Sequence, residues 1–174
     1  MKNNLIVVAL MAASSLTAMS AFADDGRINF MGAITDNACT VVNNVNNPLT
    51  VTMGTVSRTA FAAVGDTAAP TKFTIALTDC PTTVNSASVK FDGTANSNVN
   101  SILALTQETG VATNVGIQIA DKNNVVVPLY TASSAYPLQT GSNDLDFVAR
   151  YYATGAGVTA GPANATSNFT IIYN

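Results

Sequence analysis

Apolar and polar residues alternate along most of this chain, and no segment sustains the 3.6-residue spacing of an amphipathic helix. Such alternation is typical of β-strands with one buried face, because successive side chains of a strand point to opposite sides. Short strands separated by Gly-, Asn-, Asp- and Pro-containing turns predict an all-β sandwich of the Greek-key type. The apolar members of the alternating runs are Phe73, Ile75, Leu77, Val89, Phe91, Ile117, Ile119, Leu145, Phe147, Ala149, Tyr151, Phe169, Ile171 and Tyr173.

The first 23 residues have the composition of a secretory signal peptide. Lys2 supplies a positive start, residues 5–11 form a short apolar run, and the small residues Ala21 and Ala23 suit a signal peptidase. Serines and a threonine interrupt the apolar character after this run, which disfavours a retained anchor helix. We therefore expect cleavage after Ala23, with a site after Ala18 as the alternative. No later stretch is apolar enough to cross a membrane, so we expect no membrane insertion.

Removing these 23 residues from the 174 leaves 151, enough for one domain with a sizeable core. The expected organisation is a cleaved signal at 1–23, an N-terminal extension at 24–36 and a single domain at 37–174.

The charge of the mature chain excludes several classes of function. Without Lys2, six basic residues stand against ten acidic ones, a net charge of −4, and the basic residues do not cluster. Because binding to nucleic acid needs a basic surface, we expect no nucleic-acid partner. The chain has no histidine and its carboxylates are scattered, so we expect no catalytic residues, no cofactor and no enzymatic activity.

Asp144 and Asp146 are the best candidates for a metal site, because alternation places both on the same face of a strand. Calcium takes about six to eight oxygen ligands, however, and no loop supplies a dense acidic run. We interpret the pair as a solvated strand edge and expect no metal.

Cys39 and Cys80 are the two cysteines of the chain, and both lie in the exported part. Two such cysteines pair in an oxidising compartment. The alternative, a reactive thiol, needs a neighbouring base that a chain without histidine supplies poorly. We expect a structural disulfide between them.

The start of the mature chain is an alternating strand with glycines on its apolar face. A glycine weakens a strand unless another backbone or a shallow pocket must come close. A strand that docks into a groove of another molecule has that need. The residues that share this face are Gly26, Ile28, Phe30, Gly32 and Ile34.

The other end of the sequence is an alternating apolar strand formed by Phe169, Ile171 and Tyr173. Asn174 follows Tyr173 as the last residue. The pattern alone fits the last strand of an ordinary sandwich.

Several segments, taken in order, carry a resemblance to a known family. They are GAITDNACTV (32–41), TDC (78–80), ATNVGIQI (112–119), ARYYATG (149–155), and Gly161 with Tyr173 near the end. With one disulfide and a signal peptide, residues 27–174 resemble a chaperone–usher pilus subunit of the type 1 fimbrial structural pilin family.

The resemblance implies an incomplete immunoglobulin-like Greek-key sandwich that lacks its last strand and therefore has an open apolar groove. The resemblance also implies that a periplasmic chaperone lends a strand to this groove, beside the C-terminal strand of Phe169, Ile171 and Tyr173. Its basic residues grip the carboxylate of Asn174, and Gly161 and Tyr173 match the family's chaperone-recognition pattern.

At an outer-membrane usher, the N-terminal segment of the next subunit then replaces the chaperone strand, a form of β-augmentation. The implied donor residues are Gly26, Ile28, Phe30, Gly32 and Ile34. The implied product is a homo- or heteropolymer of pilus subunits, exported through the periplasm to the cell surface and contributing to adhesion.

Two questions stay open at the level of sequence. The lead-in ahead of Arg27 is only three residues after cleavage at Ala23. That is shorter than expected for a typical major rod subunit and closer to a minor tip or adaptor subunit, and the choice between major and minor subunit stays open. The cognate chaperone and usher and the receptor of the fibre are not specified. The rival function is a secreted, self-complete immunoglobulin-like recognition module that binds a host glycan or protein.

Overall fold

The computed structural model describes residues 26–32, 34 and 38–174. The chain divides into two compact units, residues 1–34 and residues 35–174, and each is described by itself. The expected signal peptide at 1–23 lies outside the described residues.

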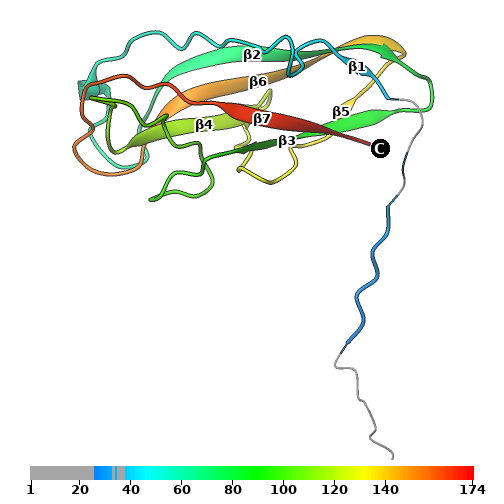
Figure 1. Cartoon of the computed structure of the whole chain (residues 1–174), viewed down its shortest axis with the longest axis horizontal. Helices are drawn as coiled ribbons and strands as arrows, with labels where there is room; N and C mark the ends of the chain where they lie inside the picture. The colour runs from blue at the N-terminus through cyan, green and yellow to red at the C-terminus, as the bar shows by residue number, and fades with distance from the viewer. Residues whose placement is uncertain (1–25, 33, 35–37) are drawn as a thin grey trace, which may run out of the picture. The chain divides into compact units, whose positions relative to one another are not determined.

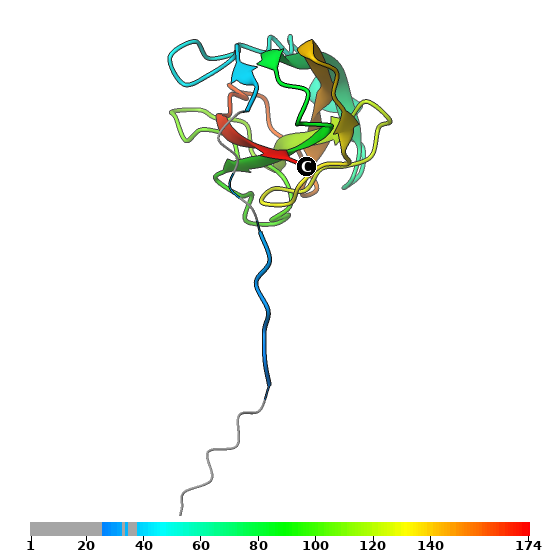
Figure 2. The ribbon, with the colours of Figure 1, turned by 90° about the vertical axis from the view of Figure 1, so that its right-hand side faces the viewer.

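The second unit is built from two antiparallel sheets (Figure 1). One has the order β1-β2-β6-β4 and the other the order β5-β3-β7. Figure 2 shows the same ribbons turned by 90°. The strands are β1 (Thr40–Val41), β2 (Thr67–Cys80), β3 (Ser86–Gly93), β4 (Val115–Asp121), β5 (Tyr136–Pro137), β6 (Gly141–Ala153) and β7 (Ser167–Tyr173).

The core lies between the sheets and centres on Phe147 of β6. Its ring stacks on Phe73 of β2 with the centroids 5.7 Å apart, and it meets Phe91 of β3 edge-on at 5.0 Å, both favoured aromatic geometries. The alternating pattern correctly predicted the buried faces of β2, β3, β4 and β6. The buried members are Ile75, Leu77, Val89, Phe91, Ile117, Ile119, Leu145, Phe147, Ala149 and Tyr151.

Strand β4 differs from the expectation of one buried face, because all seven of its residues are buried. Gln118 lies on the face expected to be solvated, and its Oε1 accepts a hydrogen bond from Arg150 Nε over 2.8 Å. The carboxylate of Asp121 accepts from the backbone amides of Asn123 and Val125, each at 2.9 Å. These bonds replace water for the polar side chains, which allows the strand to be buried on both faces.

The expectation of an all-β chain is confirmed. Beside the strands, the described residues contain a single short 3-10 helix, η1 (Arg58–Ala60). No helix in this part of the chain is long and apolar enough to span a membrane.

Candidate functional site: the open edge of strand β7

Strand β7 has one paired edge and one open edge (Figure 1). It pairs with β3 from Ala87 opposite Tyr173 to Gly93 opposite Ser167, and it is the last strand of its sheet. Within residues 38–174 no strand pairs with its other edge. Alternate backbone N–H and C=O groups of β7 therefore point sideways from the open edge, in the plane of the sheet, without a partner strand. Such an edge is a template for a further strand.

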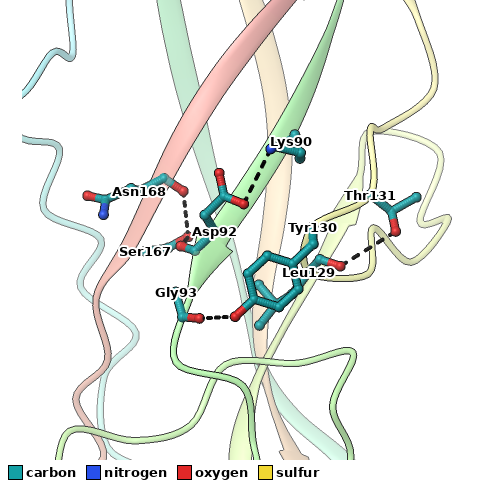
Figure 3. A network of polar contacts seen from close by, with 8 residues as sticks. All are labelled: Lys90, Asp92, Gly93, Leu129, Tyr130, Thr131, Ser167 and Asn168. Atoms are coloured by element: carbon teal, nitrogen blue, oxygen red, sulfur yellow. Dashed lines mark hydrogen bonds and ion pairs between the residues drawn. The ribbon is translucent and has the colours of Figure 1, made fainter. Parts of the chain in front are cut away.

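The paired side of β7 is also fastened by side chains (Figure 3). Ser167 Oγ donates a hydrogen bond to the carbonyl of Asp92 over 2.9 Å. The Lys90 ammonium lies 3.6 Å from the Asp92 carboxylate, and the Tyr130 hydroxyl donates to the carbonyl of Gly93. The Ser167 bond joins the beginning of β7 to β3, whereas the Lys90–Asp92 and Tyr130–Gly93 contacts involve β3 and not β7. The opposite edge of β7 is the one that remains open.

The apolar face of β7 is less completely covered than the rest of the core. Phe169, Ile171 and Tyr173 are only half-buried. By contrast, Val89 and Phe91 in the paired strand β3 are 0% and 3% exposed. The apolar side chains of the core are therefore less completely buried in β7 than in β3.

Residues 41–61 supply further apolar side chains at the margin of the core. They pack against the core and are likewise half-buried. We name these side chains, together with the three of β7, the half-buried strip. Its members are Val41, Met53, Val56, Phe61, Phe169, Ile171 and Tyr173.

Contacts at the two ends of β7 connect the two sides of the half-buried strip. At the C-terminal end, the Tyr173 hydroxyl donates to the carbonyl of Cys39 over 3.4 Å. Burial raises the pKa of this Tyr173 hydroxyl, while the bond to the Cys39 carbonyl lowers it by a smaller amount. At the other end, Val56 and Phe61 line a cavity of about 330 Å³ together with the loop that precedes β7.

Gly161 lies in that loop and not in β7 itself. A Cβ atom at this position would overlap the carbonyl oxygen of Gly110 and lie 2.7 Å from the backbone nitrogen of Ala112. The amide of Ala112 donates to the carbonyl of Pro162 over 2.9 Å, so the two backbones are held together. Only glycine permits this close approach, which gives Gly161 a structural role at the wall of the cavity.

Asn174 continues the pairing of β7 with β3 at the end of the chain. Its backbone N–H donates to the carbonyl of Ser86 over 2.9 Å. Its backbone oxygen accepts from the amides of Asn85 and Ser86 at 3.2 and 3.1 Å. The C-terminus is therefore held in register beside β3.

The disulfide between Cys39 and Cys80 is present, as expected from the sequence. It joins the residue before β1 to the last residue of β2, and both cysteines are buried. The bond therefore fixes the start of the domain at the Tyr173 end of the half-buried strip.

The model of the family described as "Fimbrial protein" matches residues 28–174, which includes the whole of the second unit's described part. The chain belongs to the fimbrial protein family. This family consists of structural fimbrial subunits and not of enzymes. This fimbrial subunit is thus a structural component that polymerises with other pilus subunits and belongs to fimbriae on the cell surface.

Curated relatives match the fimbrial subunit over nearly its full length. The probable major fimbrial subunit LpfA of Escherichia coli O157:H7 is 34% identical, covering 99% of this chain and 97% of its own. The type-1 fimbrial protein A chain of Escherichia coli K12 is 38% identical, covering 99% and 100%. These matches confirm the family resemblance seen in the sequence.

Solved structures support the immunoglobulin-like pilin fold of this subunit. A type I fimbria protein and antigen of Burkholderia pseudomallei superposes with a TM-score of 0.62 at 37% identity, over 84% of this chain and 96% of its own. The P pilus rod subunit PapA superposes with a TM-score of 0.64 at 22% identity, over 79% and 100%, and bears on the fold alone.

The N-terminal unit of the fimbrial subunit carries the apolar residues that the sequence singles out as a donor strand. Its described residues, 26–32 and 34, form no strand. The side chains of Ile28, Phe30 and Ile34 are 78%, 92% and 100% exposed. Around Gly26 and Gly32 a Cβ atom would meet nothing within 4 Å.

Asp144 and Asp146 do not come together as calcium ligands in this pilin. The Asp146 carboxylate lies 2.9 Å from Lys72 Nζ and accepts from Thr74 Oγ1 over 2.7 Å. The Lys72 and Thr74 hydrogen bonds hold the pKa of Asp146 below its usual value. Among the residues that the structure describes, no group of three acidic or cysteine side chains is arranged for a metal ion.

Sequence reasoning missed the part of the half-buried strip that lies outside the strands. Met53, Val56 and Phe61 follow neither a two-residue nor a 3.6-residue period, because residues 42–66 contain no strand. An apolar residue every three to five positions in a loop gives no periodic signal.

Proposed function

We propose that this subunit polymerises by donor-strand exchange, in which residues 24–36 of one copy pair with the open edge of β7 in another. In this proposal residues 1–23 are a signal peptide that is removed, and residues 37–174 are the pilin domain. The open edge of β7 above the half-buried strip is the observation that carries the proposal. An immunoglobulin-like sandwich with one more strand at this edge would be complete.

The lengths of the donor and the acceptor strand are compatible. At roughly 3.4 Å per residue, residues 26–34 span about 27 Å, whereas the seven residues of β7 span about 20 Å. The donor therefore covers the whole open edge and reaches beyond it. The cavity lined by Val56, Phe61 and Gly161 can take the excess.

The side-chain chemistry of the two surfaces is also complementary. Ile28, Phe30 and Ile34 are exposed, and pairing as a strand would place them on one face, while the half-buried strip is apolar. Filling each position with an apolar side chain stabilises the pair by roughly 1.5 to 3 kcal/mol. Gly26 and Gly32 allow the two backbones to approach closely between these anchors.

The open edge of β7 and the half-buried strip must be covered by a partner before the subunit is assembled into a fibre. A periplasmic chaperone that lends a strand beside Phe169, Ile171 and Tyr173, and grips the Asn174 carboxylate with basic residues, prevents edge-to-edge aggregation. An outer-membrane usher then releases the chaperone strand in favour of the donor segment of the next copy. The pairing of Asn174 with β3 supports this role, because it holds the carboxylate at a defined place.

We propose further that the subunit repeats along the shaft of the fimbria. The name of the 34%-identical relative LpfA describes it as a probable major fimbrial subunit, and this chain covers 97% of its length. Quantitative mass spectrometry of purified fimbriae tests the assignment. A shaft subunit is in large excess over the other components, whereas a stoichiometry of about one copy per fibre contradicts the proposal.

Co-expression with a chaperone from the same fimbrial system tests donor-strand exchange. The expected result is a soluble one-to-one periplasmic complex that releases the chaperone when a peptide of residues 24–36 is added. A chain that is monomeric without any chaperone, unfolds cooperatively and ignores the peptide contradicts the proposal and favours a self-complete recognition module.

A further inference from the structure

A second cavity, of about 430 Å³, lies among the loops that join the strands. Its walls come from residues 95–98, 104, 105, 107 and 111–115, and from Thr154, which follows β6. The volume is within the range of small-molecule sites, which is roughly 300 to 1,000 Å³. We call this cavity the amide pocket because of the side chains described next.

The polar lining of the amide pocket is entirely neutral. Asn96, Asn98, Gln107 and Asn114 contribute amides, and hydroxyls accompany them. None of the lining residues is charged, and none is aromatic. A phosphate, a carboxylate or an ammonium ion would find no counter-charge there, and a flat aromatic ligand would find no ring on which to stack.

Internal hydrogen bonds orient three of these amides and define what each offers a ligand. Asn96 Oδ1 accepts from the amides of Asn98 and Val99 at 3.0 and 3.3 Å, which leaves its NH₂ group as a donor. Asn114 Nδ2 donates to the carbonyl of Ala156 over 2.8 Å, which leaves its Oδ1 as an acceptor.

Gln107 Nε2 donates to the carbonyl of Leu105 over 3.1 Å, which leaves its Oε1 as a second acceptor. The pocket thus presents donors and acceptors side by side. A sugar hydroxyl matches both kinds of group, because it donates one hydrogen bond and accepts others.

Thr154 supplies an independent sign that the pocket takes a polar ligand. Its side chain is 94% buried, since only 6% is exposed, and it lines the pocket. Within the described residues, its hydroxyl oxygen is buried without a hydrogen-bond partner. A buried polar group without a partner is costly. The Thr154 oxygen has less than 1 Å² of accessible surface, so a ligand hydroxyl bonds to it only when the side chains that cover it move aside, and it then supplies a bond that the protein alone does not make.

The loops around the pocket are held in place by the backbone, as a binding site requires. The amide of Asn96 donates to the carbonyl of Ile102 over 2.9 Å, and that of Ala104 to the carbonyl of Thr94 over 2.8 Å. Leu103 exchanges two backbone hydrogen bonds with Ile117 of β4, at 2.9 and 3.0 Å. The lining is therefore anchored to the sheet.

We propose that the amide pocket binds a neutral saccharide. Without an aromatic platform, a single site is weak, with a Kd on the order of 1 mM. Repetition along a fibre, which rests on the proposed polymerisation, raises the avidity of such sites by about 10² to 10⁴. The binding itself does not depend on that repetition.

Saturation-transfer NMR on purified fimbriae tests the proposal. The probes are galactose, N-acetylgalactosamine, mannose, fucose and glucose, each at about tenfold the expected Kd, with N-acetylneuraminic acid as the charged comparison. We expect transfer to at least one neutral sugar and none to the acid. Absence of transfer to every neutral sugar overturns the proposal, because the pocket then holds water alone. A preference for the acid overturns it as well.

Three variants localise the binding. Gln107→Ala changes an exposed residue, and Thr154→Val replaces the partnerless hydroxyl by a methyl group of similar size. Each is expected to weaken sugar binding about fivefold to tenfold, the value of one hydrogen bond. Thr154→Val is also expected to leave thermal stability unchanged or higher, so its loss of binding is not a loss of fold.

Asn46→Ala is the matched control, because Asn46 is exposed and does not line the pocket. If the pocket variants bind as well as this control, the proposal is wrong. Electron microscopy shows beforehand whether fibres form. If they do not, polymerisation has failed, and the same NMR assay on the mature chain with a 24–36 peptide decides the saccharide question separately.

Discussion

The hydroxyl of Tyr173 donates to the backbone carbonyl of Cys39 over 3.4 Å, and so joins the last strand to the disulfide at the start of the domain. The two residues are 134 positions apart in sequence. Their bond connects the two sides of the half-buried strip at one end, while the edge of β7 between this bond and the cavity stays open.

Replacing Tyr173 by phenylalanine tests how much the Tyr173–Cys39 hydrogen bond contributes to the free energy of unfolding. We expect Tyr173→Phe to lower the free energy of unfolding by about 1 kcal/mol, because the Cys39 carbonyl loses its partner in a buried setting. Urea unfolding of the chaperone-free chain complexed with the 24–36 peptide measures the loss. Tyr152→Phe is the control, since the Tyr152 hydroxyl has no hydrogen-bond partner within residues 38–174. Equal effects of the two changes contradict a role for the Cys39 bond.

The Lys72–Asp146 pair is expected to contribute little at neutral pH and nothing in acid. The folded-state pKa of Asp146 is lowered, so its contribution is present above the unfolded value of about 3.9 and is lost as the pH falls through the folded value. Because Lys72 is largely exposed, Asp146→Asn should cost less than about 1 kcal/mol at pH 7. Unfolding at pH 7 and pH 2 measures this, and a cost that grows in acid contradicts the assignment.

Gly161→Ala is expected to destabilise the domain by about 1 to 3 kcal/mol, because the added methyl group overlaps the backbone of residues 110–112. Gly157→Ala is the comparison. Its Cβ would meet nothing within 4 Å, so only its positive φ of 72° opposes the change, at about 1 kcal/mol. Thermal unfolding of the peptide complexes ranks the two. If Gly161→Ala is as stable as wild type and only chaperone binding is lost, the glycine serves recognition and not packing.

Phe30 and Met31 form a matched pair for testing the donor strand. They are adjacent and both highly exposed, but alternation places only Phe30 on the face of Ile28 and Ile34. Phe30→Asp should block polymerisation and keep chaperone binding, because it buries a charge in the apolar strip of the next copy. Met31→Asp should polymerise.

Electron microscopy of the fibres and pull-down of the chaperone give the two readouts for this pair. Loss of both functions in Phe30→Asp indicates misfolding. Equal polymerisation of the two variants contradicts the donor assignment.

Sequence patterns revealed the strands of this domain better than its functional surface. The alternation in β2, β3 and β6 predicted their buried faces, because a strand between solvent and core imposes a two-residue period. In β4 the pattern predicted the buried face of Ile117 and Ile119 but missed the burial of the other face. Gln118 accepts a hydrogen bond from Arg150, 32 positions away, which no local window reveals, and Asp121 accepts from the nearby amides of Asn123 and Val125.

The alternation of apolar and polar residues could not predict the open edge of β7, because it carries no information about which strands pair. Phe169, Ile171 and Tyr173 alternate in the same way as fully covered residues, and only the sheet order reveals that one edge is unpaired. Val56 and Phe61, which line a cavity together with the loop that precedes β7, themselves lie in a loop without a period. The expectation of an incomplete sandwich came only from the family resemblance.

Hydrogen exchange of the β7 amides shows whether the open edge of β7 accepts the donor segment. The mature chain with Phe30→Asp and Gly32→Asp cannot act as a donor but keeps its own groove, and the peptide of residues 24–36 is added in trans. We expect the peptide to slow exchange most strongly at the alternate β7 amides that face away from β3, with a peptide carrying Phe30→Asp as the inactive control. Unchanged exchange along β7 at saturating peptide, or equal protection by the inactive peptide, contradicts this expectation.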